Sequence, residues 1–140
     1  MFAYDHSMAG YKIVNIKELE DMAVKFGMSP NMEARFGRAA TDAEQGGFSY
    51  QRLAANFRQP FGHRHRSQEE FYIVISGSGQ VTLEDETRPI RAWDAIRVSP
   101  ETARAFESGD DGLELLVFGA GEAGEAEVLE SFWDELPPAS

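Results

Sequence analysis

The chain has 140 residues, of which 42% are hydrophobic and 26% are charged, and it carries a formal net charge of −11. This composition is typical of one folded domain rather than a disordered chain. A surface this acidic repels phosphate backbones and anionic lipid headgroups, which argues against nucleic-acid and membrane partners. The absence of cysteine excludes disulfides, thiolate metal sites and a cysteine nucleophile.

The start of the chain carries no targeting pattern. Met1 to Gly10 lacks a basic stretch followed by an apolar core, and no apolar run approaches the ~18 residues of a membrane span. We therefore expect a cytoplasmic protein.

The first periodic segment runs from Asn15 to Gly27, where apolar residues recur at helical spacing. Asn15 can cap its start, Glu18 completes a capping box, and Gly27 suits the left-handed residue that ends a helix. The pattern predicts one short amphipathic helix, and Ser29-Pro30 offers a second, weaker helix start. Residues 1–45 are thus expected to form an arm and helix that pack on the main fold.

Residues 46–120 are typical of β-structure. Short segments rich in β-branched and aromatic residues alternate with turn signals at roughly ten-residue spacing, which predicts an all-β sandwich or barrel. Ser76 to Gly79 is expected to be a hairpin turn. The acidic tail, residues 121–140, is expected to include a short helix from Glu125 to Trp133.

One predicted strand, Phe71 to Ile75, is apolar at every position rather than at alternate positions. Such a strand needs cover on both faces. The barrel interior would cover one face and a helix or second subunit the other, and we therefore expect a homodimer.

The segment that carries chemistry is G-H-R-H-R-S-Q-E-E-F-Y from residue 62 to residue 72. His63 and His65 are two residues apart, so on a strand both imidazoles project from the same face. Glu70 follows after a gap long enough for a turn and can point to the same side from the neighbouring strand. Two imidazoles and one carboxylate that converge in this way can hold Fe, Mn, Ni or Zn and leave coordination positions open.

This segment resembles the first motif of the cupin family, G-x5-H-x-H-x(3,4)-E-x6-G. His63, His65, Glu70 and Gly77 match its histidines, its glutamate and its closing glycine, while Phe57 stands where the leading glycine is expected. The chain also resembles small bacterial cupin-domain proteins of unknown function. The resemblance implies a double-stranded β-helix, or jelly-roll barrel, that is often dimeric and holds its ligands inside the barrel mouth.

The second cupin motif, G-D-x4-P-x-G-x2-H-x3-N, is matched only in part. Asp94 matches, Pro100 is one place late, and Trp93 and Ser108 replace the glycine and the asparagine. Arg104 stands in place of the fourth ligand histidine. A guanidinium ~5 Å from a dication would repel it by on the order of 6–7 kcal/mol at an effective dielectric of ~20.

Three arrangements of Arg104 follow from this repulsion. Its side chain swings to solvent and leaves a three-ligand metal site, or it pairs with Glu70 in a metal-free pocket. Alternatively, it clamps the carboxylate or phosphate of a ligand. Tyr72 shares the strand parity of Glu70, and either Gln51 or Arg52 is expected to face the cavity, so we take Arg104, Tyr72 and Gln51 as candidate ligand-binding residues.

Two functional classes remain open, and a third possibility is a structural barrel that functions through its surface, against which the converging polar residues argue mildly. The first is a metal-dependent enzyme, of the oxygenase or isomerase type, that acts on a small polar or anionic molecule. The second is a metal-free binding or sensing barrel that recognises its ligand through Arg104 and Glu70. Trp93, Phe106 and Phe118 are expected in the core.

Overall fold

The structure, a computed structural model, describes residues 10–121 and 125–134. A short 3₁₀ helix, η1 (Ile16–Glu18), and a short α-helix, α1 (Met22–Lys25), precede the strands. The strands are β1 (Met32–Phe36), β2 (Gly46–Leu53), β3 (Gly62–His65), β4 (Glu69–Leu83), β5 (Glu86–Arg91), β6 (Ala95–Val98), β7 (Arg104–Ala120) and β8 (Ala126–Leu129).

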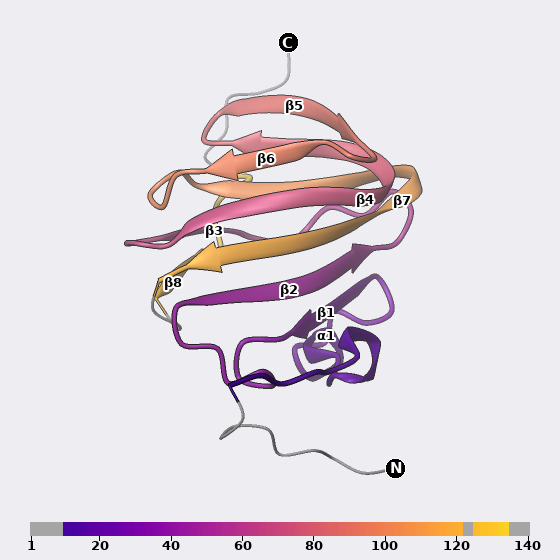
Figure 1. The fold of residues 1–140 in the computed structure, drawn as a ribbon. Helices are drawn as coiled ribbons and strands as arrows, with labels where there is room; N and C mark the ends of the chain where they lie inside the picture. The colour runs from indigo at the N-terminus through magenta and orange to yellow at the C-terminus, as the bar shows by residue number, and fades with distance from the viewer. Residues whose placement is uncertain (1–9, 122–124, 135–140) are drawn as a thin grey trace.

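All strand pairs are antiparallel, and the two long strands, β4 and β7, form the spine of the sheet (Figure 1). The second half of β7 pairs with β2, whereas its first residue, Arg104, pairs with His63 of β3. One strand therefore takes different neighbours at its two ends, and the sheet curls. The predicted all-β architecture, with a short N-terminal helix, is confirmed.

The predicted hairpin turn at Ser76 to Gly79 is wrong, because β4 runs straight through these residues. The strand bends here instead, with register shifts against β7 between Val74 and Ser76 and between Gly77 and Gly79. Gly77 has a φ of +82°, and a Cβ at this position would lie 2.1 Å from the carbonyl oxygen of Gly112. Glycine therefore lets two strands approach closely and twist, and the turn signal marks a bend within one strand.

The single helix predicted from Asn15 to Gly27 is divided in two. Asn15 accepts a hydrogen bond from the backbone N–H of Lys17 and caps η1, whereas Asp21 accepts from Ala23 N–H and caps α1. Asp21 also accepts from Ala34 N–H, which joins α1 to β1. Gly27 follows α1 with a φ of +73°, as predicted.

Two other helix predictions are wrong because sheet edges recruit the segments. The chain after Ser29-Pro30 forms β1, which pairs with β2. The tail segment from Glu125 forms β8, which pairs with β3 from Gly62↔Leu129 to His65↔Ala126. Pairing with an open sheet edge outweighs the helix propensity of the alanine and glutamate residues.

The interior is filled by side chains from β1, β2, β4, β6 and β7. Phe106 is in this core, as expected, with 1% of its surface exposed. The core prediction is wrong for Trp93, which is 77% exposed on a turn, and for Phe118, which is 41% exposed.

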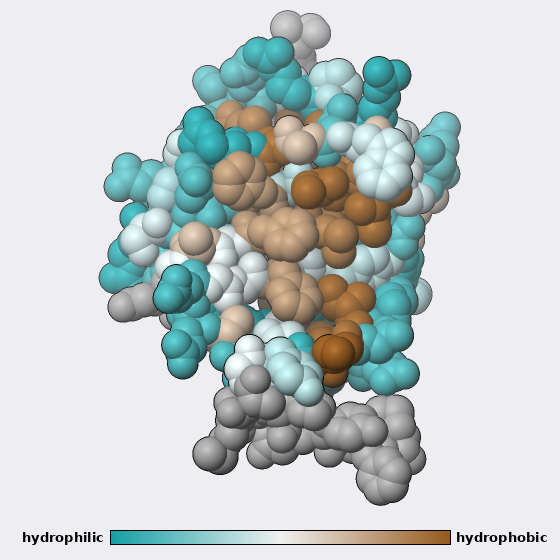
Figure 2. All heavy atoms as spheres, viewed as in Figure 1, coloured by the Kyte–Doolittle hydropathy of each residue, from teal (hydrophilic) through white to brown (hydrophobic). Residues whose placement is uncertain are grey.

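Phe118 faces outward with Phe48 and Phe71, its register partners on β2 and β4. Figure 2 shows brown side chains gathered over this side of the molecule. The predicted second cover for Phe71 is not supplied by a helix of the described chain, and the homodimer stays a prediction that sedimentation velocity would test. None of the described helices is long and apolar enough to cross a membrane.

Candidate metal centre

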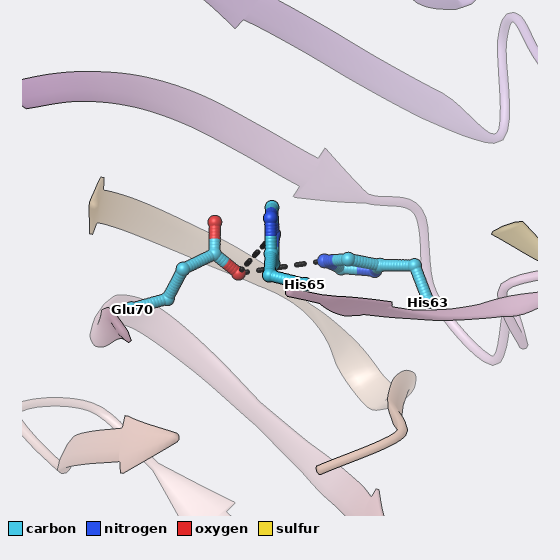
Figure 3. Close-up of side chains that lie close together, drawn as sticks. All are labelled: His63, His65 and Glu70. Carbon is cyan, nitrogen blue, oxygen red and sulfur yellow. Dashed lines mark hydrogen bonds and ion pairs between the residues drawn. The ribbon is translucent and has the colours of Figure 1, made fainter. Parts of the chain in front are cut away.

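The ligand candidates are positioned by one turn between two strands. His63 and His65 lie on β3, where their side chains point to the same face, and Glu70 is the second residue of β4. Figure 3 shows the two imidazoles and the carboxylate pointing toward one another. The strand parity and the turn together produce the convergence that the spacing predicted.

The distances are short enough for the three side chains to share one ion. Glu70 Oε1 lies 3.4 Å from His63 Nε2 and 3.2 Å from His65 Nε2. One ligand atom from each residue lies within 4.8 Å of the others. His65 and Glu70 are each 8% exposed, whereas His63 is half-buried toward the cavity.

Glu125, which the sequence analysis did not single out, orients His65. Its Oε1 atom lies 3.0 Å from His65 Nδ1. Burial alone would raise the pKa of Glu125, but backbone hydrogen bonds from Ser67, Arg66 and Gln68 lower it to about 2. Because an ionised carboxylate only accepts hydrogen bonds, His65 must donate from Nδ1.

With Nδ1 held by Glu125, His65 Nε2 is the ring nitrogen directed at Glu70 and His63. Nε2 is buried and has no hydrogen-bond partner among the described residues, and Glu70 Oε1 lies 3.2 Å from it. A buried ring nitrogen without a hydrogen-bond partner is an arrangement that a metal ion would satisfy. The donor set therefore fits a divalent transition metal.

Glu125 also fixes the loop between the two ligand strands. Its Oε2 atom accepts hydrogen bonds of 2.7 Å from the backbone N–H groups of Arg66 and Ser67, and Oε1 accepts one of 2.8 Å from Gln68 N–H. No local motif could have identified this residue, since it lies 60 positions after His65 and its role depends on β8 pairing with β3.

Glu70 has two further partners at the oxygen that faces the imidazoles. The Tyr72 hydroxyl donates a 2.5 Å hydrogen bond to Glu70 Oε1, and Arg104 Nη2 donates one of 3.1 Å to the same oxygen. Burial would raise the pKa of Glu70, but the interactions with His63, His65 and Tyr72 outweigh it and hold that pKa well below its usual value. Glu70 is thus an anion. Burial raises the pKa of Tyr72 well above its usual value, and the neighbouring Glu70 charge adds to this, so its hydroxyl stays protonated.

Among the three arrangements considered for Arg104, the structure contains the pair with Glu70. Arg104 is 0% exposed, so it does not swing to solvent. Its Nη1 also donates to the carbonyl oxygens of Pro100 (3.1 Å) and Thr102 (2.6 Å). The guanidinium contacts Glu70 and is not among the described residues that line the cavity.

A cavity of about 890 Å³ lies in front of the three ligand candidates. His63, His65, Glu70 and Tyr72 line it at one end, and Gln51 lines it from β2, donating a 3.2 Å hydrogen bond to Ser49. Most of the remaining wall is apolar and comes from α1, β1, β2 and β7. Tyr72 and Gln51 therefore line the cavity and Arg104 does not, and a ligand-binding role for the three residues stays a prediction.

A curled antiparallel sheet with a histidine and carboxylate cluster in a cavity defines a small β-protein with a candidate metal-binding group. Residues 50–119, half of the chain, match the cupin domain family, and the chain belongs to that family. Within the match lie His63, His65, Glu70 and Arg104.

The known relatives are distant. An uncharacterised protein of Methanocaldococcus jannaschii, MJ1618, is 33% identical over 55 residues, which are 39% of this chain and 44% of that protein. The match thus spans less than half of the relative's length.

Among solved structures, a cupin protein from Bacteroides fragilis is similar with a TM-score of 0.66 and 20% identity, over 82% of this chain and 87% of that one. The polyketide cyclase RemF from Streptomyces resistomycificus is similar with a TM-score of 0.69 and 20% identity, over 90% of this chain and 89% of that one. At this identity, both likenesses concern the fold.

Proposed function

We propose that the protein binds one divalent transition metal through His63, His65 and Glu70 and presents it to a small molecule in the cavity. The observation that carries the proposal is His65 Nε2, which is buried, has no hydrogen-bond partner among the described residues and faces two other ligand atoms. Glu125 supports it, because it holds His65 in the tautomer that a metal ligand needs.

A bound Fe, Mn, Ni or Zn ion would supply open coordination positions for activation of O₂ or for Lewis-acid chemistry on the small molecule. The residues around it have their own roles. Tyr72 and Arg104 hold the Glu70 carboxylate in place, and the cavity wall around the ligand atoms is mostly apolar. The fold itself assigns no reaction, because related barrels host unrelated activities.

Titration of metal-free protein with Fe(II), Mn(II), Ni(II) and Zn(II) tests this proposal. We expect one equivalent of at least one metal to bind the natural protein, and His63→Ala to abolish binding. Arg64→Ala is the matched control, because Arg64 is the neighbouring residue and pairs with Glu127 at the surface. Loss of binding in both variants, or in neither, would contradict the proposed ligand set.

The second candidate is a metal-free binding protein, and the Arg104–Glu70 ion pair favours it. That pair already neutralises Glu70, and a buried ion pair resists the approach of a further cation. Under this alternative the protein takes up none of the four metals, and a ligand binds against His63 and Tyr72 at the end of the cavity.

A further inference from the structure

We propose that the cavity receives an uncharged small molecule with an apolar body, oriented so that a hydroxyl or carbonyl oxygen meets His63, His65 and Glu70. The position of the ligand's polar end rests on the proposed function. The apolar body and the absence of charge are argued from the cavity wall and from the positions of the cationic side chains. The sequence analysis expected a polar or anionic ligand, and this inference proposes an uncharged one instead.

The wall of the cavity is mostly apolar over its length. α1 and the residues after it contribute Met22, Ala23, Phe26 and Met28, and the neighbouring strands contribute Met32, Ala34, Val117 and Val128. Methionine side chains are flexible and polarizable, and they adapt to apolar ligands of different outlines. A volume of about 890 Å³ is in the range of sites that enclose small organic molecules.

No free cationic side chain is directed at this space from the residues that line it. Arg38 is the only arginine or lysine in the lining, and its guanidinium donates to the carbonyl oxygens of Gly121 and Glu44. Arg104 is bound to Glu70 and lies outside the lining. A carboxylate or phosphate would lose its hydration and meet the anionic Glu70, which makes its burial costly.

Besides the ligand candidates and Arg38, the polar side chains among the described lining residues carry no charge. Tyr72 supplies a hydroxyl, and the amides of Gln51, Gln59 and Gln68 also belong to the lining. Hydroxyls and amides can both donate and accept hydrogen bonds, which suits a hydroxyl or carbonyl oxygen. The overall charge of −11 further disfavours an anionic ligand.

The mouth of the cavity carries apolar side chains that are exposed to water. Phe26, Phe36 and Val128 all belong to the lining, with 66%, 52% and 54% of their surfaces exposed. These residues would gain cover when an apolar body enters. The rim therefore supports an apolar ligand independently of the interior.

The test compares 1-naphthol with 1-naphthoate, which share one apolar body and differ in charge. Titration calorimetry at pH 7 is performed on metal-free protein, so that a metal cannot attract the carboxylate. We expect 1-naphthol to bind at least about tenfold more tightly, because the carboxylate would meet the anionic Glu70 and because the guanidinium of Arg38 is already bonded to backbone carbonyl oxygens.

Phe26→Ser should weaken 1-naphthol binding by roughly fivefold, because it removes apolar contact area at the rim. Val24→Ser is the matched control, since Val24 lies on α1 two residues before Phe26 and is 63% exposed but is not in the lining, and its effect should be less than about twofold.

Equal or tighter binding of 1-naphthoate, no binding of either compound, or equal effects of the two serine variants would each overturn this inference. Because the titration contains no metal, its result is separate from the metal titration. Failure to bind metal would overturn the proposed function, whereas the comparison of 1-naphthol with 1-naphthoate would still show whether the cavity prefers an uncharged ligand.

Discussion

Arg104 Nη2 donates a 3.1 Å hydrogen bond to Glu70 Oε1, the same oxygen that faces His63 and His65. Arg104 occupies the position of the cupin family's fourth ligand histidine. The guanidinium fixes the carboxylate in place and also adds a positive charge beside a site for a dication. These two effects oppose each other, so Arg104 is expected to set how tightly a metal binds.

Replacing Arg104 separates the two effects. We expect Arg104→His to bind metal at least about tenfold more tightly than the natural protein, because a charge is removed and a fourth ligand is added. Arg104→Met removes the charge only and should bind less tightly than Arg104→His. Titration calorimetry with Ni(II) and Zn(II) measures the order, and tighter binding by the natural protein than by Arg104→His would refute this explanation.

Arg104→Met should also unfold more easily. Breaking a buried ion pair by removing one partner costs roughly 3 kcal/mol or more, since Glu70 stays buried with fewer donors. Arg104→His retains a donor and should lose less. Chemical denaturation of the three metal-free proteins gives the free energies of unfolding, and equal values would show that the pair contributes little to stability.

Glu125 is expected to act on metal binding through His65. Glu125→Gln should weaken metal binding by roughly 10- to 100-fold, because the carboxylate that orients the imidazole is lost. ¹⁵N NMR of the metal-free protein should show His65 protonated at Nδ1 in the natural protein and a mixture of tautomers in the variant. A purely structural role would not shift that tautomer equilibrium.

The control for Glu125 is Glu127→Gln, two residues further along the chain. Glu127 pairs with Arg64 at the surface rather than with either histidine. It should leave both the tautomer and the metal affinity unchanged. If the two variants weaken metal binding equally, Glu125 has no special role toward His65.

The sequence predicted the ligand cluster because its geometry is local. Side chains alternate between the two faces of a strand, so His63 and His65 share one face, and a single turn brings Glu70 to the same side. The contribution of Glu125 could not be predicted, because it depends on β8 pairing with β3. The local sequence of that segment favours a helix instead. The same limit applies to Arg104, whose identity was visible but whose direction depends on the backbone carbonyls of Pro100 and Thr102.

The hairpin turn predicted at Ser76 to Gly79 was wrong because a glycine there can either reverse the chain or bend a continuous strand. Glycine often marks the end of a strand, but here the left-handed conformation of Gly77 lets β4 bend against β7 and continue. Sequence alone does not distinguish a glycine that reverses the chain from one that bends a strand, because both need the same φ.

A second cluster, away from the metal candidates, predicts how stability changes with acid. Glu33 on β1 accepts hydrogen bonds from Lys17, Arg35 and Arg52. Burial would raise the pKa of Glu33, but these three cationic partners lower it to about 2. Its stabilising contribution is therefore complete above the unfolded pKa of about 4.5 and is lost as the pH falls toward 2.

Glu33→Gln should lower the free energy of unfolding by about 1–2 kcal/mol at pH 7, less than the pKa shift alone implies, because solvent screens the partly exposed Lys17 and Arg52. The difference between variant and natural protein should shrink as the pH falls from 5 to about 2.5. Urea denaturation at several pH values measures it. A difference that is constant or grows in acid would contradict the assigned ion pairs.

The most direct measurement for the central claim is anomalous scattering from crystals of the protein grown in metal-replete medium. We expect one strong peak about 2.0–2.2 Å from His63 Nε2, His65 Nε2 and a Glu70 oxygen. Elemental analysis of the same preparation should give one metal ion per chain. A preparation that holds metal elsewhere, or none after exposure to all four candidate metals, would contradict the assignment of these three residues as a metal centre.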